Sequence, residues 1–276
     1  MNILRASTGS AYAPIRSASD GVSTVPAPSG TWSRLFGGNP AACAIAAGQL
    51  YCWGRIVLAP TNAPTMLAVT LLAGQTVTDV HFGDPFACAV YGGGERLCWG
   101  GNLYGSLGDG TMTDDPDPPA PQEAGIARVV ADDNTACELT TAGNIACWGN
   151  DNYGETGQVS GPTYSASPVS DASGPLASCT ALDFDGENGC AVCGGQVECW
   201  GYNGDGELGR GSATSGDATA APPMLPPGKT WTSVVVGNSR SCALDDAGEL
   251  YCWGYGPHGE LGDGSHASNV PIPVAP

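Results

Sequence analysis

The residues of this 276-residue chain that could do chemistry are carboxylates, amides and one arginine in polar turns, each turn following a short apolar segment. These candidates are Asp84, Asp133, Asn134, Asp185, Glu187, Asn188, Asn238 and Arg240. Carboxylates that converge raise one another's pKa, so they can serve as an acid with a base or nucleophile, or hold a hard cation such as calcium. Asp, Asn and Gly also suit tight turns, so a water-filled polar surface is the alternative.

Local motifs identify no familiar catalytic centre. The chain contains no GxSxG, HExxH or P-loop motif, and no GxGxxG between a strand and a helix. His81, His258 and His266 fall in separate segments, which argues against a histidine metal site. We therefore expect no cofactor, with calcium as the one cation considered.

All 12 cysteines fall into pairs that a hairpin would set opposite one another. Between Cys43 and Cys52, a two-residue turn at Ala47-Gly48 brings the two cysteines into register. Opposed residues on antiparallel strands have Cα atoms about 4.5–5.5 Å apart, a separation that a disulfide bridges. The predicted disulfides are Cys43–Cys52, Cys88–Cys98, Cys137–Cys147, Cys190–Cys199, Cys242–Cys252 and Cys179–Cys193.

The alternative to the sixth bridge is a zinc site. Cys190 and Cys193 form a CxxC, with Cys179 and Cys199 nearby. Zinc would leave the other four pairs unexplained, whereas disulfides account for every cysteine. Disulfides throughout indicate an oxidising compartment, so we expect an extracellular or periplasmic protein. No signal peptide is visible, so it has been removed or the chain is a fragment of a longer secreted protein.

A Cys-Trp-Gly tag, or a local variant of it, recurs about every 50 residues, a period typical of a β-propeller or a β-solenoid. The tag tryptophans are Trp53, Trp99, Trp148, Trp200 and Trp253. Each repeat is predicted to hold four antiparallel strands, A to D, with B and C forming the disulfide-linked hairpin. We expect the tryptophans to pack between blades, with a ligand-stacking ring as the alternative.

Glycine-rich loops follow the tag, as in Tyr202-Asn203-Gly204-Asp205-Gly206-Glu207-Leu208-Gly209. Together with the preceding hairpin, this pattern resembles the RCC1-like repeat family (regulator of chromosome condensation type), in particular its cysteine-bearing bacterial branch. The resemblance covers residues 31–276 and is best in the fifth copy. The first copy departs from it, because Arg55–Pro60 contains no such loop.

The resemblance implies an all-β fold, a β-propeller of five RCC1-like four-stranded repeats (blades). The predicted repeats are residues 31–75, 76–125, 126–176, 177–229 and 230–276. Residues 1–30 form a separate N-terminal segment, in which Ala11–Ile15 resembles a strand that could close the ring. The family usually has seven blades, so a closed five-blade ring and an open arc both remain open.

In a propeller strand A is innermost, so the A–B turns lie beside the central channel and should bring the candidate residues together. The resemblance implies a binding module for a protein, a small molecule or a carbohydrate at one face of the ring. The alternative is a glycosidase- or esterase-like hydrolase with Asp84, Asp133 and Glu187 as its catalytic carboxylates.

The charge balance restricts the partners. The net charge is −18, from 9 Lys and Arg against 27 Asp and Glu. So few basic residues cannot line a groove that follows phosphates, so we exclude nucleic acid and anionic membranes as partners. No apolar stretch is long enough to span a membrane. We expect an acidic, monomeric protein.

Overall fold

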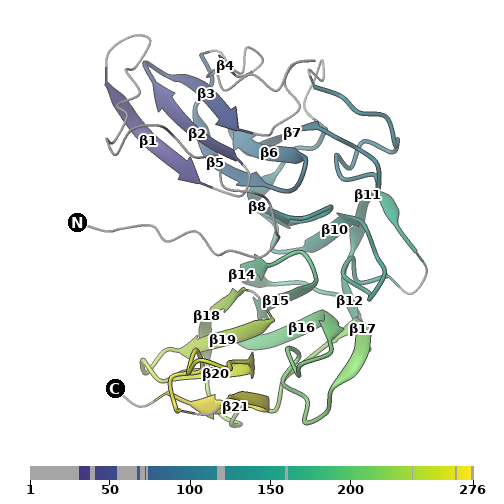
Figure 1. The fold of residues 1–276 in the computed structure, drawn as a ribbon, viewed down its shortest axis with the longest axis vertical. Helices are drawn as coiled ribbons and strands as arrows, with labels where there is room; N and C mark the ends of the chain where they lie inside the picture. The colour runs from purple at the N-terminus through teal and green to yellow at the C-terminus, as the bar shows by residue number, and fades with distance from the viewer. Residues whose placement is uncertain are drawn as a thin grey trace, which may run out of the picture.

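Short antiparallel strands make up the secondary structure of the protein, as the alternating apolar residues and frequent glycine turns predict (Figure 1). The computed structural model describes residues 31–37, 41–54, 67, 68, 72, 74–116, 122–158, 161–237, 239–264 and 266–274. Within these ranges, no helix is long and apolar enough to cross a membrane.

The strands form five blades and one small hairpin. Blade 1 contains β1 (Trp32–Gly37), β2 (Ala41–Ala46), β3 (Gln49–Gly54) and β4 (Leu67–Ala68). Blade 2 contains β5 (Val77–Phe82), β6 (Phe86–Tyr91) and β7 (Glu95–Gly100). Blade 3 contains β8 (Ile126–Asp132), β9 (Thr135–Thr140), β10 (Ile145–Gly149) and β11 (Thr163–Pro168). The hairpin contains β12 (Ser170–Asp171) and β13 (Gly174–Pro175). Blade 4 contains β14 (Cys179–Phe184), β15 (Asn188–Cys193), β16 (Gln196–Asn203) and β17 (Thr214–Ala221). Blade 5 contains β18 (Trp231–Val236), β19 (Arg240–Asp245), β20 (Leu250–Tyr255) and β21 (Ala267–Pro273).

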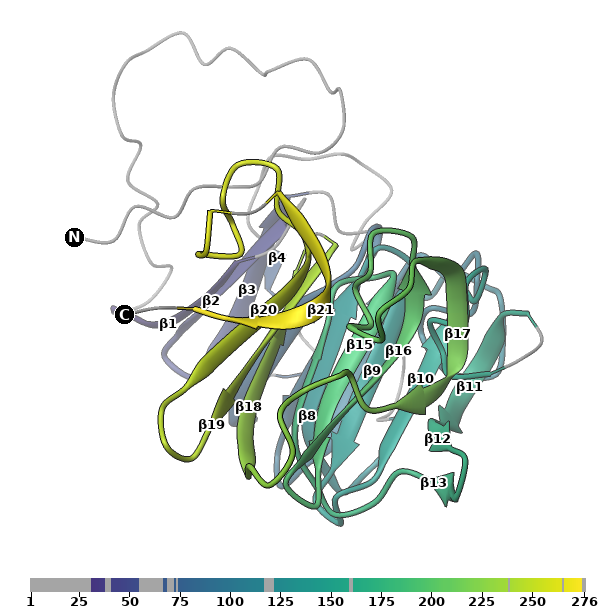
Figure 2. The same cartoon turned by 90° about the horizontal axis from the view of Figure 1, so that it is seen from below.

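The blades follow one another around an arc, from blade 1 at the top of Figure 1 to blade 5 at the bottom. The first strands β8, β14 and β18 lie towards its concave side, and β11 and β17 lie on its outside (Figures 1 and 2). The fold is therefore the predicted β-propeller of four-stranded repeats, and its described part is an open arc. The predicted closing strand at Ala11–Ile15 lies outside the described residues, and the limits of the repeats stay a prediction.

Blade 2 replaces most of its fourth strand with a side chain. Its outer edge carries two isolated bridges, Arg96 with Glu123 and Gly100 with Asp115. The Gln122 side chain accepts a hydrogen bond from Cys98 N at 2.6 Å and donates one to Cys98 O at 2.8 Å. The amide thus imitates the paired N–H and C=O groups of a neighbouring strand, which satisfies the edge of β7.

All six predicted disulfides are confirmed. Five join the second and third strands of a blade, with Cα atoms 4.0–4.1 Å apart. The sixth, Cys179–Cys193, joins β14 to β15 with a Cα separation of 3.8 Å. These bridges occupy all four cysteines of the alternative zinc site, so that alternative was wrong.

Four hydrophobic clusters each join two neighbouring blades. Representative pairs across successive junctions are Phe36 with Val80, Val90 with Val129, Val130 with Leu182, and Val192 with Val234. Within the described part of the chain, no such cluster joins blade 5 to blade 1. The core is therefore a series of inter-blade layers, open at both ends of the arc.

The tag tryptophans link each blade to the loop of the blade before it. The indole Nε1 atoms of Trp148, Trp200 and Trp253 donate to the carbonyls of Ser106, Glu155 and Glu207, at 2.8, 3.0 and 2.6 Å. Trp99 is buried too, but its Nε1 has no partner among the described residues. Its counterpart loop would follow Trp53, where the sequence lacks the glycine-rich motif.

Trp53 departs from the prediction that every tag tryptophan is buried between blades. It is only half-buried, because no described blade precedes blade 1. With Trp32, Leu35 and Ala44 it lines a surface cavity of about 410 Å³ on the open side of blade 1. The stacking-ring alternative receives no support from the other four, which are fully buried.

Candidate functional site

The A–B turns of blades 2 to 4 meet on the concave side of the arc. Asp84 N donates to the carbonyl of Asp133 at 2.7 Å, which joins the turns of blades 2 and 3. This close approach requires glycine at position 83, because a Cβ there would lie 2.5 Å from the Asp133 oxygen. We call Asp84, Asp132, Asp133, Asp185 and Glu187 the acidic rim.

Asp185 extends the acidic rim to blade 5. Its Oδ1 accepts hydrogen bonds from the backbone N–H groups of Glu187 and Asn188, at 3.4 and 3.2 Å. Its Oδ2 accepts from Ser239 N in the next blade, at 3.3 Å. Asp185 therefore holds two turns in place, and Glu187 beside it reaches solvent.

The carboxylates of the acidic rim lie within electrostatic range of one another across three blades. Burial, followed by the charge of Asp84, raises the pKa of Asp133. Burial also raises the pKa of Glu187, with further contributions from Asp185 and Asp133. The rim is therefore a concentrated negative field on a rigid scaffold, with Asp133 and Glu187 exposed for contact.

Asp132 belongs to the rim although it was not among the predicted site residues. Burial raises its pKa to about 7, opposed by the N–H of Asp133 and reinforced by the charges of Asp133, Asp185 and Glu187. The sequence held one signal for it, the adjacent pair Asp132-Asp133. Strand alternation obscured that signal, since neighbours on a strand usually face opposite ways.

The remaining predicted residues do not form one cluster. Asn188 is buried between blades 4 and 5, where its Nδ2 donates to Ser241 Oγ at 3.4 Å. Asn134 uses its carbonyl to accept from Ser106 Oγ at 2.9 Å. Arg240 lies near the loop of blade 5, where its charge contributes to lowering the pKa of Glu260. Asn238 lies outside the described residues.

The inner strands below the rim carry a row of charges from three blades. Asp183 Oδ2 accepts from Val236 N at 2.8 Å, and its Oδ1 lies 3.5 Å from Arg128 Nη2. His81 Nε2 lies 3.6 Å from Asp79 Oδ1, and burial lowers the pKa of His81. The two contacts of Asp183 join blade 4 to blades 5 and 3, whereas the His81–Asp79 pair lies within β5 of blade 2.

The loops after the tag are structural in blades 3 and 4. Glu155 Oε2 accepts from Tyr153 N at 2.6 Å, and Glu207 Oε2 accepts from Asp205 N at 2.9 Å. Both side chains are buried, and burial raises the pKa of each to about 7. Because their backbone carbonyls also receive the tag tryptophans, these residues belong to the blade junctions.

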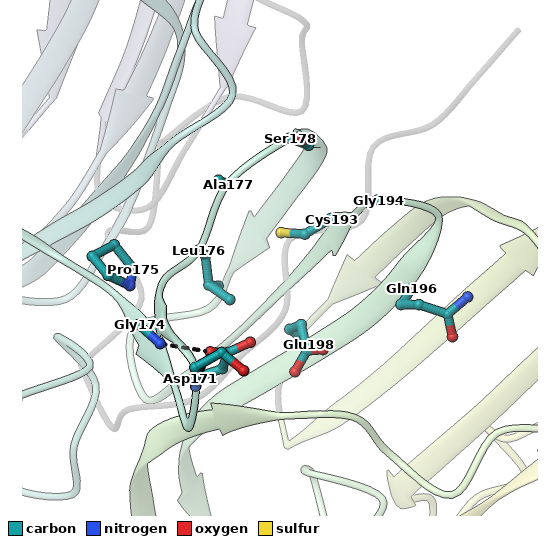
Figure 3. Close-up of a pocket in the computed structure, with 11 residues that line it drawn as sticks. Asp171, Gly174, Pro175, Leu176, Ala177, Ser178, Cys193, Gly194, Gln196 and Glu198 are labelled. Carbon is teal, nitrogen blue, oxygen red and sulfur yellow. Dashed lines mark hydrogen bonds between the residues drawn. The ribbon is translucent and has the colours of Figure 1, made fainter.

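A second candidate site lies on the outer side of blade 4, beside the β12–β13 hairpin (Figure 3). This cavity of about 390 Å³ is lined by Asp171, Leu176, Cys193, Gln196 and Glu198, among others. Neither it nor the cavity on blade 1 is lined by the predicted catalytic carboxylates. Within the described ranges, no three His, Cys, Asp or Glu side chains are grouped to hold a metal.

Comparison with known families identifies one repeat directly. The family model of the regulator of chromosome condensation (RCC1) repeat matches residues 231–260. Among curated proteins, the mitochondrial RCC1 domain-containing protein RUG3 of Arabidopsis thaliana is 39% identical over 71 residues, which are 26% of this chain and 16% of the relative. The human E3 ubiquitin-protein ligase HERC2 is 37% identical over 76 residues, 28% of this chain and 2% of the relative.

Solved structures share the fold over most of the chain. Human WBSCR16 has a TM-score of 0.73 at 16% identity, covering 89% of this chain and 67% of that one. Prp20p of Saccharomyces cerevisiae has a TM-score of 0.66 at 18% identity, covering 86% and 61%. The chain thus spans about two thirds of these propellers and a small part of the curated relatives.

The sequence motif, the strand register and the fold all indicate the same type of repeat. Four-stranded blades, tag tryptophans that bind the preceding loop, and a family-model match in blade 5 are found in one chain. The chain therefore contains an RCC1 repeat at residues 231–260 and shares its fold with the RCC1-type β-propellers.

Proposed function

We propose that this chain is a binding module that recognises a basic surface of a partner protein through its acidic rim. The observation that carries the proposal is the convergence of carboxylates from blades 2, 3 and 4, on turns joined by the hydrogen bond from Asp84 N to the carbonyl of Asp133. Burial, and then the charges of neighbouring carboxylates, raise the pKa values of Asp132, Asp133 and Glu187. Binding of a cationic group would relieve this repulsion, which supplies a favourable free energy specific to basic partners.

The relatives are consistent with a protein partner. Prp20p is described as binding Gsp1p and histones, and yeast RCC1 has been solved bound to Kap60. The six disulfides indicate an oxidising compartment, and we propose an extracellular or periplasmic location. A carbohydrate ligand and the hydrolase alternative have no comparable support, because the predicted catalytic carboxylates line neither described cavity.

The test is binding of a lysine-rich peptide by the intact chain, measured by calorimetry at two salt concentrations. The double variant Asp133→Asn/Glu187→Gln should bind several-fold more weakly and lose much of the salt dependence, because both carboxylates are exposed at the rim. The matched control Asp246→Asn/Glu123→Gln removes two exposed carboxylates elsewhere and should bind like the wild type. Equal losses in both variants would show that net charge alone attracts the peptide.

A further inference from the structure

The cavity on blade 4 coincides with two departures from the repeat. The β12–β13 hairpin and the Cys179–Cys193 disulfide have no counterpart in the other described blades. Cys193 and Gly194 line one wall of the cavity, so the Cys179–Cys193 disulfide anchors that wall to β14. The walls are therefore held before any ligand arrives, which lowers the entropic cost of binding.

A third departure places a charge in the cavity. Glu198 immediately precedes the tag cysteine of blade 4, on β16. The residues at this position in the other blades are Tyr51, Leu97, Ala146 and Tyr251. A carboxylate thus replaces an apolar or aromatic side chain in this blade alone, so a purely structural role in the repeat does not account for it.

The negative charge in the cavity is incompletely compensated. Figure 3 shows the side chains of Asp171 and Glu198 lying near one another, from the hairpin and from β16. Asp171 Oδ1 accepts from Ser173 N at 2.6 Å and Gly174 N at 3.0 Å, which shapes the hairpin. Glu198 Oε2 is buried and has no hydrogen-bond partner among the described residues.

The cation whose charge acts on Glu198 is Arg210, and both of its Nη atoms bind other groups. Arg210 attracts Glu198, but its Nη1 lies 2.7 Å from Asp217 Oδ2. Its Nη2 donates to the carbonyls of Cys199, Thr219 and Ala221. A buried carboxylate oxygen without a partner is costly, so a ligand that supplies a positive hydrogen-bond donor would be stabilised there.

We propose that this cavity binds a primary ammonium group on an aliphatic stem, with the ammonium between Asp171 and Glu198 and the stem against Leu176. An ammonium brings three donors on a compact charge, which suits two carboxylates in a small space. Calcium needs about six to eight oxygen ligands, and among the described residues two carboxylates line this cavity. A lysine side chain of a partner protein and a free aliphatic amine share this chemistry.

The test is a nuclear magnetic resonance titration of the intact chain with n-butylammonium and, separately, with Nα-acetyl-lysine amide. Both should produce saturable shifts at the amides of Gly194 and Gln196, which border the cavity. Tighter binding of the lysine derivative would identify a protein side chain as the source, and tighter binding of butylammonium a free amine. Saturable binding of uncharged n-butanol at the same amides would overturn the proposal.

Variants separate the cavity from the acidic rim. Glu198→Gln should weaken binding at least about tenfold, the value of one charge-assisted hydrogen bond. Asp171→Asn keeps an acceptor for the hairpin and should also weaken binding, whereas Asp246→Asn and the rim variant Asp133→Asn/Glu187→Gln should not. Unchanged melting temperature and six intact disulfides would confirm that Glu198→Gln folds. Equal affinity in wild type and Glu198→Gln would refute the site.

The pH dependence gives an independent readout. Burial and the charge of Asp171 raise the pKa of Glu198 to about 6, while Arg210 lowers it. Protonation of Glu198 competes with the ammonium, so affinity should fall as the pH drops through about 6. A flat affinity across this range in the wild type would contradict the assignment of Glu198.

Discussion

The interior junctions and the open side of blade 1 present the same repeat position in opposite environments. Val80, Val129, Leu182 and Val234 occupy equivalent places on the first strand of blades 2 to 5, and each is at most 5% exposed. Leu35, the equivalent residue of blade 1, is 62% exposed. Burial at this position is thus created by the preceding blade and not by the residue's own sheet.

Blade 5, at the other end of the arc, shows the same effect for the first-strand residue that faces the following blade. Val130 of blade 3 faces the next blade and is 1% exposed, whereas its equivalent Val235 in blade 5 is 55% exposed. The charged positions differ in the same way. Glu155 has its pKa raised to about 7 by burial, whereas the equivalent Glu260 has its pKa lowered by the N–H of His258. The exposed fraction and the pKa of equivalent residues therefore depend on which blade packs against them.

The largest expected effect is at the tag tryptophan of a filled junction. Trp148→Ala should lower the free energy of unfolding by about 3–5 kcal/mol, since the side chain is fully buried. The change also removes the hydrogen bond to Ser106 and the ring beneath Arg96, whose guanidinium carbon lies 4.0 Å from the ring centroid. Urea denaturation with intact disulfides measures this, and Trp53→Ala is the matched variant at the open side.

Trp53→Ala should cost well under half as much, because Trp53 is only half-buried. Equal costs at the two positions would mean that the open side of blade 1 is covered in solution. A small cost at Trp148 would instead show that the junction between blades 2 and 3 does not contribute as its burial implies.

The second comparison uses leucine at the equivalent first-strand position. Leu182→Ala should destabilise the chain by about 2–5 kcal/mol, because it leaves a cavity between blades 3 and 4. Leu35→Ala should stay within about 0.5 kcal/mol, as for an exposed surface residue. Differential scanning calorimetry of both variants checks the pair. A large loss at Leu35 would indicate that chain outside the described residues packs on it.

The smallest expected effect is on the pH dependence of stability, which should have opposite signs for Glu155 and Glu260. The folded-state pKa of Glu155 is raised to about 7 from 4.5, so the folded chain holds this proton more tightly than the unfolded chain. Its contribution to stability is therefore present below about pH 4.5 and is lost as the pH rises towards about 7. Melting temperatures from pH 4 to 8 should show this fall, and Glu155→Gln should reduce it.

Glu260 has a lowered pKa in the folded state, so its contribution is present above the unfolded value and is lost on acidification. Glu260→Gln should therefore leave the fall between pH 4.5 and 7 in place and make the chain less sensitive to acid. The same pH profile for both variants would remove the distinction between the junction and the open end.

Much of the blade was predictable because its information is local. Cys88 and Cys98 are ten residues apart across one hairpin, so alternation and turn length determine their pairing. The same holds for Cys179 and Cys193, whose strands meet at a single turn. The convergence of the A–B turns followed from the repeat, since equivalent turns must gather around one axis. Asp132 was missed because strand alternation places neighbouring residues on opposite faces, and because its burial depends on the turn of blade 4.

The contacts between neighbouring repeats could not be predicted from the sequence. The sequence by itself determined four-stranded blades, six disulfides and a tag tryptophan for each junction, because hairpin register and strand alternation act over about ten residues. Only the tertiary structure decided that no described blade covers Trp53 and Leu35 and that Glu198 shares a cavity with Asp171. The burial and the electrostatic environment of these residues depend on elements of neighbouring blades. A local sequence pattern does not specify contacts between residues so far apart in the chain.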